Sequence, residues 1–162
     1  MQQILAGALA GLTATGPMTA LMVAAHDSLP AGERYGLPPE RVTANAARAL
    51  GAKDVASERE PRVWATLPMH FGYGAAMGAI YGTVADRLPG PATVKGVGFG
   101  LLVWAGSYLG LLPAVGLHRP ATREPAGRNG MMIGAHVIFG AVLGVLAEKG
   151  TRNSRHKAFK AK

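Results

Sequence analysis

Two histidines stand in the same local pattern at two places in the chain. His70 begins the stretch His-Phe-Gly-Tyr-Gly-Ala-Ala-Met-Gly, and His136 begins His-Val-Ile-Phe-Gly-Ala-Val-Leu-Gly. Each pattern has an aromatic residue three positions after the histidine, and glycines four and eight positions after it. Each also lies in a long apolar stretch, where a histidine is costly enough to need a reason. The pattern therefore marks His70 and His136 as candidates for a buried titratable or ligand-binding site.

Such an imidazole pair is compatible with four roles. The two histidines could ligate a haem b from both faces, or bind a divalent metal, for which the only carboxylate nearby is that of Asp27. They could titrate, since the ordinary pKa of histidine is about 6.5, and so move protons. They could also hold helices together through hydrogen bonds. The expected partners of those bonds are Thr13, Thr15, Ser107 and Tyr108.

The elements that position these histidines are predicted to be membrane helices. Of the 162 residues 49% are hydrophobic and only 16% are charged, whereas a soluble domain has about 25% charged residues. A transmembrane helix needs about 20 apolar residues. Four stretches approach or exceed that length, and we expect residues 1–150 to form an all-α polytopic membrane protein, a four-helix transmembrane bundle. The predicted spans are residues 3–25, 63–85, 95–117 and 130–148.

Glycines recur at intervals of four in every predicted span. In lipid, helices associate through close backbone contact, which small residues permit. The sequence therefore predicts tight packing of the bundle through these glycines, with faces left for a membrane-protein partner or a second copy of the chain. The predicted packing residues are Gly7, Gly11, Gly74, Gly78, Gly82, Gly106, Gly110, Gly140 and Gly144.

The connectivity of four spans predicts which histidines lie together. Spans 63–85 and 130–148 run in the same direction, so His70 and His136 should lie at similar depth. His26, Asp27 and His118 end the other two spans and should lie at the surface on that same side. This arrangement suggests a parallel two-plus-two repeat of the kind that transporters use.

The segments outside the spans predict contacts with the membrane surface. Residues 39–50 have the features of a short interfacial helix, with prolines at its first turn and Gly51 at its end. Residues 151–162 form a basic tail, and a net charge of +8 in a membrane protein suggests anionic lipid as its partner and no nucleic acid. The predicted head-group contacts are Arg152, Arg155, Lys157, Lys160 and Lys162. The distribution of charge favours cytoplasmic termini.

No pattern typical of an enzyme is present. The sequence has no phosphate-binding loop, no nucleophile with a neighbouring base and no cysteine. We therefore expect no catalytic residues, no cofactor and a non-enzymatic membrane protein: an accessory subunit of a membrane complex or a small acid- or stress-related protein. The alternatives are a redox subunit that binds haem b or a metal, and a proton-coupled transporter.

Several segments together resemble a known family. Ala10–Thr19, Glu33–Pro39, His70–Gly74 and Val103–Gly110 are similar to segments of the YagU-like family, small proteins of the bacterial inner membrane with unknown function. The resemblance implies four spans, a multi-pass location in the bacterial inner membrane and a link to acid resistance. It implies no catalytic residues.

Overall fold

The computed structural model describes the backbone of residues 1–160 and the side chains of residues 1–152. This part of the chain consists of helices and loops, without a strand. Three single-turn 3₁₀ helices connect longer elements: Ala31–Glu33, Ala85–Arg87 and Ala121–Arg123. The other elements are α1 (Gln2–His26), α2 (Pro38–Ala49), α3 (Lys53–Ser57), α4 (Arg59–Val84), α5 (Ala92–Ala105), the π-helix η3 (Gly106–Leu111), α6 (Leu112–Ala114) and α7 (Ala126–Lys160).

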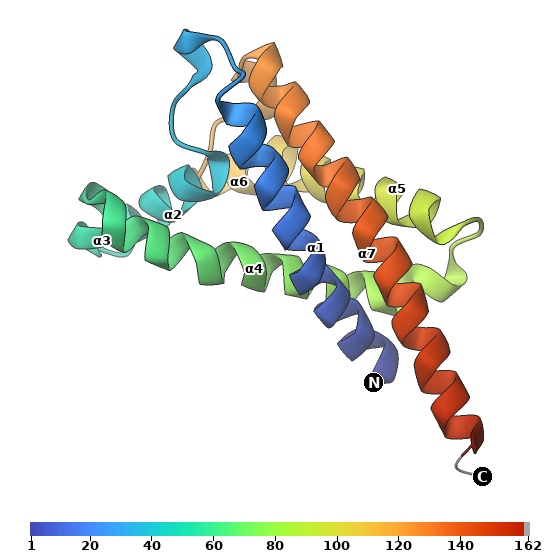
Figure 1. The fold of residues 1–162 in the computed structure, drawn as a ribbon. Helices are drawn as coiled ribbons and strands as arrows, with labels where there is room; N and C mark the ends of the chain where they lie inside the picture. Colours follow the sequence, from blue (N-terminus) through green and yellow to red (C-terminus); the bar gives the residue numbers. More distant parts are fainter. Residues whose placement is uncertain (161–162) are drawn as a thin grey trace.

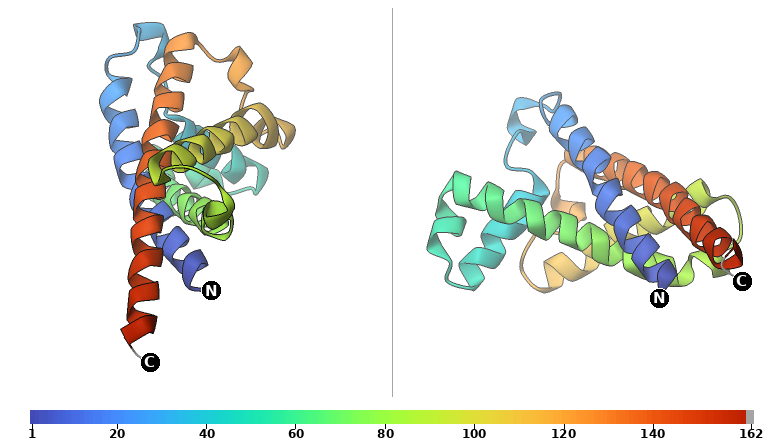
Figure 2. Two further views of the ribbon diagram at one scale, coloured as in Figure 1. Left: turned by 90° about the vertical axis from the view of Figure 1, so that its right-hand side faces the viewer. Right: turned by 60° about the horizontal axis from the view of Figure 1, so that its bottom comes forward.

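The long helices form two layers. Helices α1 and α7 lie side by side and run in opposite directions, because Ala6 approaches Gly150 while Leu21 approaches Gly134. Helices α4 and α5 lie together on one side of this pair and cross it at a wide angle (Figures 1 and 2). Helix α4 packs mainly on α1, and α5 packs mainly on α7, whereas α4 and α5 touch each other little. The two crossing helices therefore leave space between them.

Three helices are long and apolar enough to cross a membrane: Gln2–His26, Ala92–Ala114 and Ala126–Arg152. Helix α4 corresponds to the predicted span 63–85 but does not meet that criterion. It begins with charged side chains, including Arg59 and Arg62, and its centre is rich in glycine. The predicted four-helix transmembrane bundle is therefore not confirmed by apolar length alone.

Both helix pairs cross through glycines. A β-carbon at Gly7 or Gly11 of α1 would collide with the backbone of α4, at the carbonyl oxygens of Gly78 and Gly74 respectively. A β-carbon at Gly96 or Gly100 of α5 would likewise collide with carbonyl oxygens of α7. Those oxygens belong to Gly140 and His136. The helices approach closely only because these positions lack side chains.

The register of these contacts differs from the register of the sequence repeat. In the sequence His136 matches His70, but in the packing His136 takes the place of Gly74, since these two carbonyl oxygens meet Gly100 and Gly11. The two registers differ by one helical turn. The predicted two-plus-two repeat is therefore not confirmed, although the two pairs cross in a similar way.

Two predicted packing glycines have no such role. At Gly106 and Gly110 a β-carbon would meet no atom of the described residues within 4 Å. Both lie in the π-helix η3, which interrupts the predicted span 95–117. Pro113 follows this segment and has no backbone N–H to donate to the carbonyl of Leu109, so regular α-helical bonding cannot continue there. A π segment often occurs at functional sites, and this one carries Ser107 and Tyr108.

The long loop folds back over the ends of α1 and α4. Helix α2 spans Pro38–Ala49, close to the predicted 39–50, and Gly51 ends it with a φ of +76°. Helix α2 packs on α4, and its residues Val42 and Thr43 face the space between α4 and α5. The loop helix thus covers one end of the space between the crossing helices.

Candidate functional site

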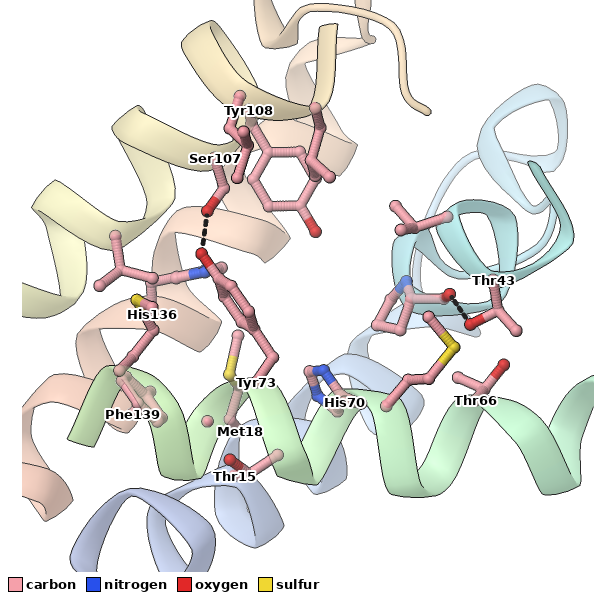
Figure 3. A pocket seen from close by; sticks show the side chains of 18 residues that line it. Thr15, Met18, Thr43, Thr66, His70, Tyr73, Ser107, Tyr108, His136 and Phe139 are labelled. Carbon is pink, nitrogen blue, oxygen red and sulfur yellow. Dashed lines mark hydrogen bonds between the residues drawn. The ribbon is translucent and has the colours of Figure 1, made fainter. Parts of the chain in front are cut away.

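A partly open cavity of about 150 Å³ lies between α4, α5 and α7, beneath α2. Figure 3 shows the side chains around it. Both predicted candidates, His70 of α4 and His136 of α7, line this cavity, so the structure brings them to one place. We call it the His70–His136 cavity. Its other lining residues are Thr15, Met18, Pro39, Val42, Thr43, Thr66, Met69, Tyr73, Gly74, Met77, Val103, Ser107, Tyr108, Leu111, Leu112 and Phe139.

His70 has an unsatisfied ring nitrogen. Its Nε2 atom is buried and has no hydrogen-bond partner among the described residues. Its ring contacts Phe71 edge to face, at 6.1 Å between centroids. A buried nitrogen without a partner costs about 1–3 kcal/mol. That cost is removed when a molecule in the cavity supplies the partner.

His136 has one of its two ring nitrogens occupied. Its Nδ1–H donates a hydrogen bond of 2.8 Å to the carbonyl oxygen of Met132, one turn earlier in α7. This bond fixes the orientation of the ring, which is 4% exposed. In a neutral imidazole the other nitrogen, Nε2, then serves as an acceptor. His136 therefore offers an acceptor, whereas His70 can offer either role.

Hydroxyl groups complete the polar lining. Tyr73 and Ser107 are hydrogen-bonded to each other, with 2.8 Å between their oxygens, and so connect α4 to the π segment. The hydroxyl of Tyr108 points into the space from the side opposite His70 (Figure 3). The ring of Tyr108 also packs edge-on against His136, with 6.0 Å between centroids. Polar groups thus face the cavity from both of its walls.

The predicted interhelical bonds of the histidines do not form. The hydrogen bond of His136 stays within its own helix, and His70 makes none with the described residues. Thr15, one of the expected partners, donates to Gly11 of its own helix instead. The interpretation of the pair as hydrogen-bonded glue between helices is therefore not supported.

The cavity matches a small ring better than a macrocycle. An engineered apolar cavity of about 150 Å³ in another protein holds benzene, and a haem is several times larger than a benzene ring. Among the described residues no group of three or more His, Cys, Asp or Glu side chains could hold a metal ion. The cavity therefore does not fit haem b as it stands, and among its described lining residues the two histidines are the only side chains of the His, Cys, Asp and Glu types.

The residues predicted at the surface beside the pair lie in two environments. His26 is partly exposed, 3.6 Å from the carboxylate of Asp27, and its Nε2 is 3.2 Å from the carbonyl oxygen of Tyr35. His118 is buried rather than at the surface, because it packs edge-on against Tyr108 at 5.2 Å. Burial lowers the pKa of His118, which favours the neutral ring. Neither His26 nor Asp27 lines the cavity.

The structure also contains a buried arginine network that the sequence analysis did not predict. The Arg128 side chain is almost fully buried, and its guanidinium donates to the carbonyl oxygens of Glu33, Tyr35 and Gly36 at 2.9–3.0 Å. It also stacks on the ring of Tyr35, 3.8 Å from the centroid, and pairs with Glu124 at 3.6 Å. The spacing of Glu124 and Arg128, four residues apart at the start of a span, is the sequence signal that could have revealed it.

Glu124 is the centre of that network. It accepts a hydrogen bond of 2.5 Å from the hydroxyl of Tyr35 and pairs with Arg41 at 3.2 Å. Burial alone would raise the pKa of Glu124, but the hydrogen bond from Tyr35 and the charge of Arg41 outweigh it and hold the pKa below its usual value. Burial, and then the bond to Glu124, raise the pKa of Tyr35. The network joins the loop after α1 to the start of α7.

A second cavity, of about 190 Å³, lies at the opposite end of the molecule. It is lined by charged side chains of α5, of α7 and of the segment between α4 and α5, including Lys95 of α5 and Glu148 and Arg152 of α7. Arg152 is the one predicted head-group contact whose side chain is described. The side chains of Arg155, Lys157 and Lys160, and the whole of Lys162, lie outside the described residues.

The fold and the cavity define the general class of this protein. It is an all-helical protein with apolar helices long enough to cross a membrane and a small cavity between its helices. The chain belongs to DUF6789, a family of unknown function whose sequence pattern matches residues 1–158. No curated protein and no solved structure gives a significant match. The family is thus DUF6789, and the YagU-like assignment and the bacterial origin it implied have no support from these comparisons.

Proposed function

We propose that this chain is a non-enzymatic integral membrane protein that binds a small amphipathic molecule in the His70–His136 cavity. One observation carries the proposal: polar side chains of α4, η3 and α7 converge on a cavity whose walls are mostly apolar. A few convergent polar groups in an apolar pocket are typical of a small-molecule site. The unpartnered Nε2 of His70 gives such a molecule a hydrogen bond to complete.

The access route supports a ligand that comes from the bilayer. The cavity is partly open, and residues on its rim are exposed: Met69 and Tyr73 of α4 by 48% and 41%, and Leu111 of η3 by 55%. In a membrane, such apolar rim residues would face lipid tails. A molecule dissolved in the bilayer could therefore enter between α4 and α5 without crossing water.

We also propose that α4 is a fourth, tilted crossing. Helix α7 is antiparallel to both α1 and α5, so α1 and α5 run in the same direction. If both cross the membrane, the chain between them has to return across it. Helix α4 is antiparallel to α1 and has 26 residues. At 1.5 Å per residue it is about 39 Å long, against a hydrocarbon core of about 30 Å.

The crossing of α4 can be tested by single cysteine labelling, because the natural chain has no cysteine. Gly32→Cys and Thr122→Cys should react with an impermeant maleimide on one side of the membrane, and Pro89→Cys on the other. Labelling of Pro89→Cys on the same side as Gly32→Cys would rule out a crossing by α4. With cytoplasmic termini, only Gly32→Cys and Thr122→Cys should be labelled in intact cells.

Ligand binding can be tested with 4-decylphenol, a simple ring with one hydroxyl and an apolar tail. A ligand at about 100 times its Kd adds about 2.7 kcal/mol to stability, so the thermal midpoint of the detergent-purified protein should rise with its concentration. Val103→Phe, which fills the cavity, should abolish this rise. Val94→Phe adds the same ring at an exposed position of the same helix and should retain it. An equal rise in both variants would contradict the proposal.

Other expectations from the sequence remain proposals about the setting of this protein. They are a location in the bacterial inner membrane, contact of the basic tail with anionic lipids, and a role as an accessory subunit beside a membrane-protein partner or a second copy. An acid-related role would be supported by the two histidines that line the cavity. Co-purification with a stoichiometric partner tests the accessory role directly.

A further inference from the structure

The walls of the His70–His136 cavity suit a flat ring. Met18 and Met77 line it with thioether side chains, and Phe139 lines it with an aromatic ring. Methionine sulfur makes favourable contacts with aromatic and other flat π systems. The volume of about 150 Å³ is close to that of a cavity that holds a single six-membered ring. The cavity therefore favours a ligand whose polar end is a flat ring over one whose polar end is branched or globular.

The polar groups of the cavity face each other across that space. His70 projects from α4, with its Nε2 unpartnered, and Tyr108 directs its hydroxyl inward from η3 (Figure 3). A phenol O–H donates readily, and a neutral imidazole can present an N–H. Two donors on opposite sides match a ring that carries an acceptor oxygen at each of two opposite edges.

The uncharged lining of the cavity argues against amphipathic ligands with a charged group. Among the described residues that line the cavity, none is Lys, Arg, Asp or Glu. A fatty-acid carboxylate or an amine would therefore enter without a counter-charge, at high cost. A simple alcohol would satisfy one of the two donors and leave the other buried and unpaired.

We propose that the molecule in this cavity is a membrane quinone, a 1,4-benzoquinone whose two carbonyl oxygens accept hydrogen bonds from His70 and Tyr108. The tail of the quinone leaves between α4 and α5 into the lipid. This inference rests on the proposed function and names the ligand of the same site. It concerns binding, and no electron or proton is transferred in it.

The test compares three probes with the same decyl tail: a decyl-1,4-benzoquinone, 4-decylphenol and decanol. The reporter is the fluorescence of Trp104, which follows the lining residue Val103 in α5, in a Trp64→Phe background that removes the other tryptophan. Quinone quenching should saturate. The phenol and decanol should displace the quinone only at concentrations about tenfold higher or more, since each lacks one of its two hydrogen bonds.

Two variants test the assigned partners. Tyr108→Phe removes one oxygen and should weaken quinone binding about tenfold, and His70→Leu should do the same. Tyr81→Phe is the matched control, since Tyr81 is buried in α4 but does not line this cavity. It should leave binding unchanged. If His70→Leu does not fold, Tyr108→Phe decides alone, and an unchanged affinity there overturns the inference.

The outcomes separate this inference from the proposed function. Saturable binding of 4-decylphenol that is as tight as quinone binding would overturn the quinone and leave an amphipathic ligand site. Quenching by the quinone that rises linearly without saturating, with no displacement by the other two probes and no protection in the thermal assay, would mean partition into the micelle and would overturn both.

Discussion

His136 donates from Nδ1 to the carbonyl oxygen of Met132 at 2.8 Å, whereas the Nε2 atom of His70 in the same cavity has no partner among the described residues. The two histidines share one sequence pattern, yet their side chains differ in what they contribute to the folded protein. His136 has a ring nitrogen hydrogen-bonded within its own helix, whereas the buried Nε2 of His70 has no partner among the described residues. This asymmetry leads to a direct test.

Replacing the two histidines by leucine should have opposite effects on stability. His70→Leu removes a buried unsatisfied nitrogen and should raise the free energy of unfolding by about 1 kcal/mol. His136→Leu loses a hydrogen bond and should lower it by about 1 kcal/mol. Thermal unfolding in detergent, without added ligand, measures both. A loss of stability in His70→Leu as large as that in His136→Leu would mean that His70 has a structural bond.

The close helix crossings predict that glycines in one helix respond differently to the same substitution. In α4, a β-carbon at Gly78 would collide with the backbone of α1 at Gly7 and Gly11, while one at Gly72 would meet open space. Gly78→Ala should therefore cost about 1–3 kcal/mol, because the helices must separate. Gly72→Ala should be neutral or stabilising, since alanine favours a helix. The thermal midpoints of the two variants provide the measurement, and equal midpoints would contradict the crossing.

The same glycines show where prediction from the sequence ends. Apolar stretches locate α1, α5 and α7, and the prolines and Gly51 locate α2, because these signals are local. The crossing register is not local: glycines at intervals of four in α4 fit a partner equally well after a shift of one turn. The sequence match of His70 with His136 does not give the register of the crossings, since in the packing His136 takes the place of Gly74.

The arginine network was missed for a related reason. Its bonds connect residues 33–36 with residue 128, which are far apart in the sequence. A basic residue near a span end is ordinarily an exposed head-group contact, so Arg128 resembles its exposed neighbour Arg123. The spacing of Glu124 and Arg128 was the one local signal, and the burial of Arg128 depends on how the loops fold around it.

Arg128 should be intolerant even of lysine. Its guanidinium donates to three carbonyl oxygens and stacks on Tyr35, and an ammonium group cannot reproduce that planar set. Arg128→Lys should cost about 3 kcal/mol or more, as expected when a buried charge network is broken. Arg123→Lys, at an exposed site of the same loop, should change stability by less than about 0.5 kcal/mol. Chemical unfolding of the two variants in detergent makes the comparison, and similar stabilities would mean that the network contributes little.

Acid should destabilise the protein through Glu124. Burial alone would raise the pKa of Glu124 in the folded protein. The hydrogen bond from Tyr35 and the charge of Arg41 outweigh that effect and lower the pKa. The unfolded chain, with a pKa near 4.5, therefore binds the proton more tightly. The contribution of Glu124 is fully present above that pH and is lost as the pH falls through the folded pKa. Buried His118, whose pKa is also lowered, adds a loss that begins at higher pH.

Comparison of variants isolates the part that belongs to Glu124. Glu124→Gln keeps the shape of the side chain but cannot ionise. As the pH is lowered below about 4.5, its thermal midpoint should therefore fall less than that of the natural protein. The contribution of His118 is present in both proteins. Glu58→Gln removes an exposed carboxylate outside the network and should keep the natural acid response. An unchanged acid response in Glu124→Gln would place the acid-sensitive groups elsewhere. A flatter response in that variant alone would assign the acid sensitivity to the Tyr35–Glu124–Arg41 contacts that join the loop after α1 to the start of α7.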